Sequence, residues 1–145
     1  MNATIRRMTE DDLQEVLRIE DSVFSNPWSR RSFAYELNSD IAICTIASCN
    51  NSVIGYVCTQ ALLGQAYILK LAVHPAFRRQ GVATLLIDDT LKTLREPACQ
   101  EILLEVRRSN DPALGLYEGF GFKWLSVRRQ YYSAPTEDAI TMILR

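Results

Sequence analysis

The sequence contains no hydrophobic run of the roughly 18 residues that a bilayer-spanning helix needs. Its first twelve residues are rich in charged side chains, unlike a secretory signal. We therefore expect a cytoplasmic protein with no membrane segment and no membrane partner. Proline and glycine are scarce, with 5 and 6 residues, and no repeat or low-complexity segment is present. This composition excludes collagen-like and disordered classes.

Metal-binding residues are few. The chain contains a single histidine, His74, and 4 cysteines that form no C-x-x-C pair. A structural zinc site needs four suitably spaced ligands of these types, so no metal is expected. We interpret the cysteines as reduced core thiols, and His74, which follows an apolar segment, as a turn or packing residue.

No charge of one sign predominates, because 16 basic and 17 acidic side chains leave a net charge of -1. There is thus no global field to attract nucleic acid, and a polyanionic ligand would have to bind locally. Hydrophobic residues make up 48% of the chain and charged residues 23%, as in globular proteins. At this length the chain is expected to form one domain over residues 1–145.

The patterning of apolar residues predicts an α/β fold. The segment from Thr9 resembles a capping box that begins a helix reaching the low twenties, and Ser29 is expected to cap a second helix. These two helices are expected to precede any strand. Residues 41–48 and 53–59 are rich in β-branched side chains and flank Asn50-Asn51-Ser52, which predicts a β-hairpin.

The middle of the chain predicts a parallel crossover. Residues 66–73 are nearly all apolar and predict the buried central strand, residues 79–94 a helix, and residues 101–107 a second buried strand. A short helix to Tyr117 and two antiparallel strands, over 122–132 and 139–144, complete the pattern. The expected fold class is a mixed central sheet flanked by helices.

The segment 78–84 lies between the predicted central strand and the next helix. Backbone N–H groups at a helix N-terminus attract phosphate, Gly81 permits close approach, and Arg78 and Arg79 add positive charge. Taken alone, the pattern is a weak signal and favours a solvated basic turn. It is not a mononucleotide P-loop, because no Gly-Lys-Ser/Thr follows Gly81.

Two side chains are unusual in their predicted surroundings. Glu105 lies within an apolar strand, where an unpaired carboxylate costs desolvation. It could act as a general base or form an ion pair with Arg107 or another arginine. Tyr117 could carry a reactive hydroxyl or pack against Phe120 and Phe122.

Asn110 and Trp28 each admit two roles. Asn110 could cap the helix that follows it and could also offer its amide to a ligand. Trp28, next to a proline, could act as a hydrophobic staple or line a substrate groove.

Four motifs follow one another along the chain and together resemble the GNAT acetyltransferase family. They are Leu71-Ala-Val-His-Pro, Arg78-Arg-Gln-Gly-Val-Ala, Leu104-Glu-Val-Arg-Arg-Ser-Asn110 and Leu116-Tyr-Glu-Gly-Phe-Gly-Phe122. The flanking segments 26–29, 128–132 and 137–142 resemble members of that family that act on protein N-termini. The resemblance covers nearly the whole chain and implies the GNAT fold.

The resemblance also implies acetyl-CoA as cosubstrate and a protein N-terminus as acceptor, namely the N-terminal alanine of a small-subunit ribosomal protein. Two sets of residues are then expected to contact the cosubstrate. The backbone of Leu71, Ala72 and Val73 would pair with the pantetheine arm, which Asn110 would also hold. The pyrophosphate would be cradled by Arg79, Gln80, Gly81, Val82, Ala83 and Thr84.

The same resemblance implies that Glu105 acts as general base and Tyr117 as general acid, in a direct transfer without a covalent enzyme intermediate. Trp28, Tyr131 and Tyr132 are expected to contact the acceptor. Lys70 departs from the family pattern, because relatives often carry a neutral polar residue there. A cation at this position could change which acceptors are accepted.

Two alternatives stay open at this stage. One is a GNAT enzyme of broader specificity, acting on other protein N-termini or on a small amine. The other is a non-catalytic CoA-binding module, which would keep the 78–84 segment but would not need Glu105 and Tyr117.

Overall fold

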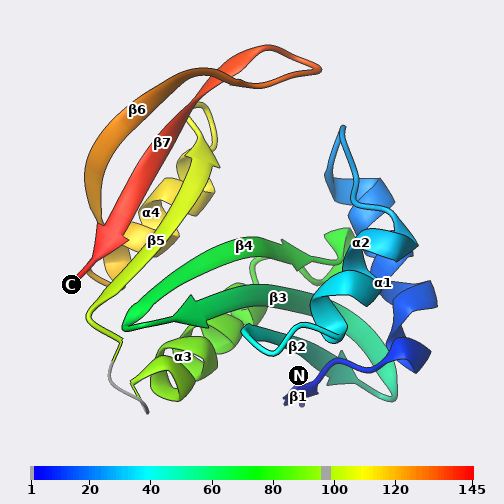
Figure 1. Ribbon diagram of the computed structural model, residues 1–145. Helices are drawn as coiled ribbons and strands as arrows, with labels where there is room; N and C mark the ends of the chain where they lie inside the picture. Colours follow the sequence, from blue (N-terminus) through cyan, green and yellow to red (C-terminus); the bar gives the residue numbers. More distant parts are fainter. Residues whose placement is uncertain (1, 96–98) are drawn as a thin grey trace.

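The computed structural model describes residues 2–95 and 99–145, which form a seven-stranded mixed sheet with helices on both faces (Figure 1). The strand order is β1-β2-β3-β4-β5-β7-β6. Only β4 and β5 pair in parallel, and the other neighbours are antiparallel. The predicted fold class is confirmed. The strands are β1 (Thr4–Arg7), β2 (Ala42–Cys49), β3 (Ser52–Leu62), β4 (Gln65–Val73), β5 (Glu101–Arg107), β6 (Lys123–Tyr132) and β7 (Glu137–Leu144).

The helices begin largely where their caps predict. The capping box at Thr9 opens a short 3-10 turn, η1 (Glu10–Asp12), that leads into α1 (Leu13–Val23). Ser29 caps α2 (Arg30–Leu37) by accepting a hydrogen bond from the Ser32 backbone. No helix in the described part of the chain is long and apolar enough to cross a membrane.

The expectation that two helices precede any strand is wrong, because β1 comes first. Its sequence, Thr-Ile-Arg-Arg, is largely exposed and shows no sustained apolar alternation. The strand exists because its backbone pairs with β2, from Thr4 opposite Ser48 to Arg7 opposite Thr45. Such a tertiary pairing leaves little signal in so short an edge strand.

The helix after the central strand also starts later than predicted. α3 runs over Val82–Leu94, whereas the prediction began at Arg79. Arg79 and Gly81 have φ angles of 62° and 81°, in the left-handed region that an α-helix cannot include. A Cβ on Gly81 would meet no atom within 4 Å, so its backbone conformation, and not crowding, favours glycine there.

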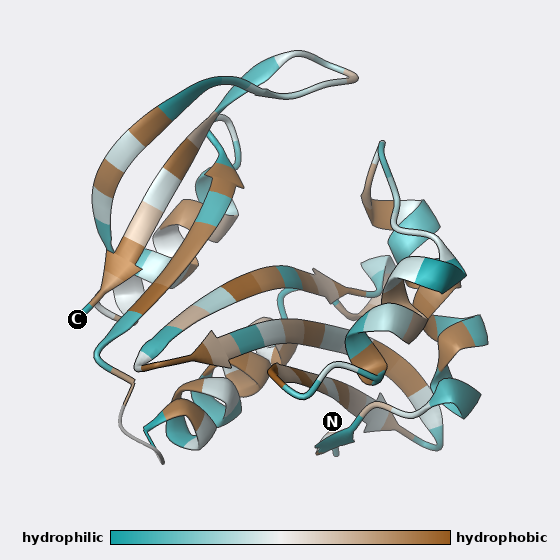
Figure 2. Ribbon diagram, in the orientation of Figure 1, coloured by the Kyte–Doolittle hydropathy of each residue, from teal (hydrophilic) through white to brown (hydrophobic). Residues whose placement is uncertain are grey.

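Two hydrophobic cores cover opposite faces of the sheet. The larger contains the apolar faces of α3 and α4 (Asp111–Gly119), and the smaller contains those of α1 and α2. Hydrophobic residues accordingly make up much of the central strands, as Figure 2 shows. Cys44, Cys49, Cys58 and Cys99 are all free thiols, as predicted.

A β-bulge at Leu69 reverses which face each β4 side chain covers. In the register with β3, Ile68 pairs with Thr59 and Lys70 with Cys58, so Leu69 has no partner residue. Ile68 before the bulge packs in the larger core, whereas Ala72 after it packs in the smaller. The bulge therefore turns Lys70 towards α1.

The two parallel strands separate halfway along their length. Their register runs from Gln65 opposite Glu101 to Ile68 opposite Leu104 and ends there, although both strands continue. Beyond this point the β4 edge that faced β5 has no strand partner. The divergence opens the sheet at the segment that carries Glu105.

Gly55 on β3 lies where α3 packs closely against the sheet. A Cβ there would lie 3.0 Å from the Ala72 carbonyl oxygen, 3.1 Å from Val82 and 3.2 Å from Leu86. We predict that Gly55→Ala lowers the free energy of unfolding by about 1–3 kcal/mol, because the backbone and α3 must separate to admit the methyl group. Urea denaturation measures this change.

Gly115→Ala provides the matched control for this prediction. Gly115 lies inside α4, and an added Cβ would meet no atom within 4 Å. Alanine has the higher helix propensity, so this variant should be at least as stable as the parent protein. Equal stability of the two variants would show that α3 is not tightly packed against Gly55.

Candidate active site

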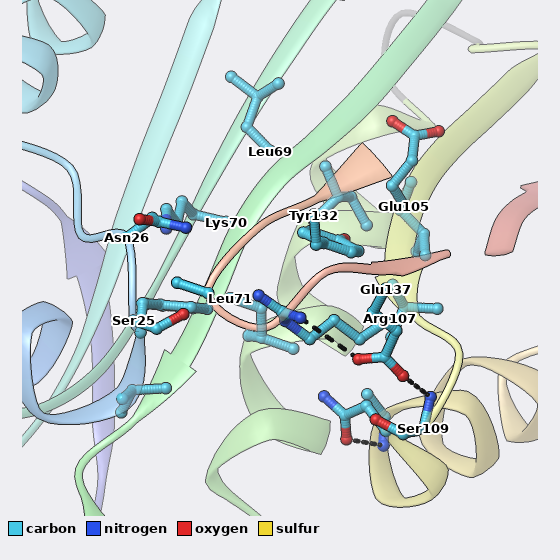
Figure 3. A pocket seen from close by; sticks show the side chains of 18 of the residues that line it. Ser25, Asn26, Leu69, Lys70, Leu71, Glu105, Arg107, Ser109, Tyr132 and Glu137 are labelled. Atoms are coloured by element: carbon cyan, nitrogen blue, oxygen red, sulfur yellow. Dashed lines mark hydrogen bonds and ion pairs between the residues drawn. The ribbon is translucent and has the colours of Figure 1, made fainter. Parts of the chain in front are cut away.

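A cavity of 540 Å³ occupies the place where β4 and β5 diverge. Its walls come from β4, β5, α4, the segment between α1 and α2, and the turn between β6 and β7. Figure 3 shows Asn26 and Lys70 on one side of the cavity and Glu105 and Arg107 on the other. The splayed strands thus bring side chains from distant parts of the sequence around one space.

Glu105 lines this cavity from β5, and its side chain is only 11% exposed. Its Oε1 lies 3.8 Å from Nη1 of Arg128 on β6. Its Oε2 is buried and has no hydrogen-bond partner in the described part of the chain. Glu105 therefore pairs with Arg128. The sequence had offered Arg107 or another arginine as its partner. Burying a carboxylate oxygen without a hydrogen-bond donor costs free energy, and such an oxygen is suited to accept a hydrogen bond from a ligand.

Tyr117 lines the same cavity from α4 and is 6% exposed. Its ring packs edge-on against Phe122, with 5.6 Å between centroids. Burial raises the pKa of Tyr117 well above its ordinary value, with a further contribution from Tyr132. The packing role and the reactive role considered from the sequence are compatible, because the ring packs against Phe122 while the residue lines the cavity.

Arg107 holds the turn between β6 and β7 against the cavity. Its guanidinium donates to the carbonyl oxygens of Ser133 and Pro135, each at 2.9 Å, and to Oε1 of Glu137 at 3.3 Å. It also lies 4.5 Å from the ring centroid of Tyr132. Burial raises the pKa of Tyr132 to about 12, so this ring is neutral at physiological pH. These contacts fix Tyr132 as part of the cavity wall.

A second contact joins this turn to the opposite wall. Nδ2 of Asn26, between α1 and α2, donates to the backbone oxygen of Ser133 at 2.9 Å and lies 3.0 Å from its Oγ. The β6–β7 hairpin accordingly reaches across the diverging strands towards α1 and α2 (Figure 1). The cavity is bridged on this side, which limits the width of any group that enters it there.

The residues predicted to hold a cofactor lie along the free edge of β4 and at the start of α3. Leu71 lines the cavity, whereas the side chains of Ala72 and Val82 are buried in the cores, so only their backbones could contact a ligand. Arg79, Gln80, Gly81 and Thr84 are exposed and Ala83 is half-buried. Asn110 lines the cavity and caps α4 through Oδ1, at 3.2 Å from the Ala113 nitrogen. This cap leaves the amide group of Asn110 available to a ligand.

Residues 13–122 match the model of the acetyltransferase (GNAT) family. The chain belongs to this family. The predicted family is thereby confirmed, and with it the predicted acyltransferase class.

Known GNAT proteins resemble this chain in sequence and structure over nearly its whole length. A relative from Escherichia coli K12, named as a [ribosomal protein bS18]-alanine N-acetyltransferase, is 32% identical over 97% of this chain and 96% of its own. The crystal structure of the ribosomal-protein-S18-alanine N-acetyltransferase from E. coli superposes with a TM-score of 0.92, at 32% identity, over 99% of this chain and 93% of that chain. A chain of the NatC complex bound to Gag peptide and CoA gives a TM-score of 0.89, at 28% identity, over 99% of this chain and 98% of that one.

The residues predicted to contact the acceptor lie at different depths of this GNAT fold. Tyr132 lines the cavity. Tyr131 is 50% exposed and stands edge-on beside it, at 5.0 Å between centroids. Trp28 packs against Phe33 at 5.1 Å and does not line the cavity. Contact of these side chains with an acceptor stays a prediction.

Sequence reasoning missed the structural roles of Arg107, Asn26 and Glu20. The partners of Arg107 and Asn26 lie in the distant 133–137 segment, so no local pattern could reveal them. Glu20 left a signal, because it is an acidic residue at a helical position whose neighbours are apolar. His74 caps the 3-10 turn η2 (Pro75–Phe77), in line with the predicted turn role. Within residues 2–95 and 99–145, no cluster of metal-binding side chains occurs.

Proposed function

We propose that the chain, acting as one domain over residues 1–145, is a protein N-terminal acetyltransferase. It would transfer the acetyl group of acetyl-CoA to the N-terminal alanine of a ribosomal protein, the bS18 type for which its E. coli relative is named. The observation that carries this proposal is the free Oε2 of Glu105 in a cavity that Tyr117 also lines. The buried Glu105 carboxylate can accept a proton and the buried Tyr117 phenol can donate one, which are the two proton transfers of the reaction.

The fold offers acetyl-CoA an extended edge and an anion site. The β4 edge beyond Ile68 has no strand partner, so its backbone groups suit the amides of the pantetheine arm. The first-turn backbone N–H groups of a helix have no partner within it, and those of α3 lie next to exposed Arg79, an arrangement that suits a pyrophosphate. Acetyl-CoA would supply the thioester, whose carbonyl oxygen the Val73 amide would polarise.

Glu105 would remove the proton that keeps the acceptor unreactive. An α-ammonium group has a pKa of about 7.7–8.0 and must lose a proton before its nitrogen can attack a thioester. Oε2 of Glu105 can accept that proton directly or through a water, since no donor among residues 2–95 and 99–145 bonds to it. Arg128, beside Oε1, leaves Oε2 free for this role.

Tyr117 would supply the second proton transfer. The departing CoA sulfur leaves as a thiolate, and a phenol can protonate it. Tyr117 is protonated at neutral pH, as a phenol ordinarily is, and its position on the cavity wall makes that proton available to the leaving group. Direct transfer between two substrates held together in the cavity needs no nucleophile from the enzyme, so none of the cysteines is required.

A CoA-release assay tests the proposed function. The purified chain would be mixed with acetyl-CoA and a short peptide that begins with alanine and copies the N-terminus of the small-subunit ribosomal protein. Mass spectrometry would locate the acetyl group, which we expect on the α-amine. Peptides beginning with Ser, Met-Glu and Met-Leu, and a polyamine, would run in parallel. Preferred acetylation of one of these would replace the proposed acceptor, whereas no transfer to any amine would refute the proposal.

Substitution of Tyr132 should weaken binding of the acceptor more than binding of the cosubstrate, because Tyr132 forms the cavity wall beneath the β6–β7 turn. We predict that Tyr132→Ala raises the peptide KM by about tenfold and the acetyl-CoA KM by less than about twofold. Steady-state kinetics with each substrate varied in turn measure both values. Equal increases in the two KM values would contradict the assignment, and Tyr132→Phe should stay close to the parent enzyme.

A further inference from the structure

Glu20 is a fully buried carboxylate that the proposed chemistry does not use. Its Oε1 accepts a hydrogen bond of 2.5 Å from the Tyr56 hydroxyl. Its Oε2 lies 2.5 Å from Nζ of Lys70 and accepts a hydrogen bond of 2.9 Å from the Trp28 backbone. Three donors from β3, β4 and the segment between α1 and α2 thus converge on one side chain of α1. Such a buried pair is stable only with its hydrogen bonds complete.

Lys70 connects this buried carboxylate to the cavity. It lines the cavity, yet its side chain is only 10% exposed. Its Nζ lies 3.6 Å from the ring centroid of Phe24 and 5.3 Å from that of Trp28. Both distances are within the range of cation–π attraction. The ammonium is therefore neutralised by Glu20 and covered by the segment that holds the two aromatic rings.

The pair thereby fixes one wall of the cavity. We call residues 24–28 the acceptor wall, since Phe24, Ser25 and Asn26 line the cavity and face β5 across it. The segment is not part of a helix or a strand, so the cavity wall depends on side-chain contacts for its position. Lys70 and Glu20 hold its two ends, at Phe24 and Trp28, while Asn26 bridges to Ser133.

We propose that Lys70 is a positioning residue for the acceptor: clamped by Glu20, it holds the acceptor wall at the distance from Glu105 that an entering N-terminus requires. This inference rests on the proposed function, because it concerns the same cavity. It differs from a direct electrostatic role, since the adjacent Glu20 carboxylate offsets the Lys70 charge and the pair has no net charge. The effect of Lys70 on acceptor choice that the sequence predicts would then act through the position of the acceptor wall.

The test compares kinetic constants of three variants with those of the parent enzyme. Lys70→Met removes the ammonium, Lys70→Arg keeps a cation, and the double variant Glu20→Gln with Lys70→Met removes both charges, so that no buried charge is left unpaired. Lys92→Met is the matched control, because Lys92 pairs with Asp88 at 2.9 Å on the surface of α3 and is 70% exposed. Peptide and acetyl-CoA would be varied separately.

We expect the peptide KM of Lys70→Met and of the double variant to rise about tenfold while the acetyl-CoA KM changes less than about twofold. Lys70→Arg should recover part of the loss, and Lys92→Met should match the parent. If Lys70→Met does not fold, the peptide KM of the double variant tests the proposal. A folded double variant with an unchanged peptide KM would overturn the proposal, because the pair would then serve stability alone.

Fluorescence provides a readout independent of turnover. Trp28 and Trp124 are the 2 tryptophans, so Trp28 is the sole tryptophan in a Trp124→Phe background and can be excited selectively over tyrosine. Acrylamide should quench Trp28 more strongly once the double variant releases the acceptor wall, and unchanged quenching would count against the proposal. If the parent enzyme acetylates none of the peptides, the proposed function fails, and quenching still shows whether Lys70 holds the wall.

Discussion

Glu105→Gln is expected to lower kcat/KM for the alanine peptide by about 10²–10⁴-fold, the usual contribution of a general base. Glutamine keeps the size of the side chain and can still occupy the space beside Arg128, but it cannot accept a proton from an ammonium group. Acetyl-CoA should bind this variant as tightly as it binds the parent, because Glu105 is not among the residues proposed to hold the cosubstrate. Kinetics and titration calorimetry measure the two effects.

Glu101→Gln is the matched control for this substitution. Glu101 lies on the same strand, is 37% exposed, and is 3.4 Å from Arg145 at the surface, away from the cavity. It should keep the parent activity. Full activity of Glu105→Gln, or an equal loss in both variants, would remove Glu105 from the proposed mechanism.

Tyr117→Phe is expected to lower kcat by about 10²-fold or more, because it removes a proton donor from the cavity. The stability of the fold should change little, since phenylalanine keeps the edge-on contact with Phe122. Tyr35→Phe is the matched control, because Tyr35 on α2 is 72% exposed and lies outside the cavity. Comparable losses in the two variants, or none in Tyr117→Phe, would refute the general-acid role.

The pH profile of kcat provides a second test of Tyr117. Burial raises its pKa above its ordinary value, so the acidic form that donates the proton persists through neutral and moderately alkaline solution. Ionisation of Tyr117 should therefore cause no loss of kcat below about pH 10. A decline of kcat centred below that pH in the parent, absent from Tyr117→Phe, would show that the pKa of Tyr117 is not raised.

Most of the fold could be predicted because its signals are local. Capping residues such as Ser29 and apolar strands such as residues 101–107 carry their own periodicity, and the structure places elements at both. β1 and the start of α3 were mispredicted for the opposite reason. β1 depends on pairing with β2, and the start of α3 depends on left-handed φ angles at Arg79 and Gly81.

In the candidate site, too, some residues could be predicted from local sequence and some contacts could not. Glu105 and Tyr117 could be selected because a carboxylate in an apolar strand is unusual and because the motifs around both residues resemble the GNAT family. The contacts of Arg107 with Ser133 and Glu137 could not be predicted, because they join positions that only the β6–β7 turn brings together. The proposed roles of Glu105 and Tyr117 await the experiments above.

The sequence by itself determined the family, the mixed sheet and the two side chains that carry the proposed proton transfers, since these follow from local pattern and motif. The tertiary structure decided how those side chains are used. Divergence of β4 from β5 opens the cavity and leaves Oε2 of Glu105 without a partner. The bulge at Leu69 turns Lys70 away from α3 and onto Glu20. Both effects depend on register between strands, which no single segment encodes.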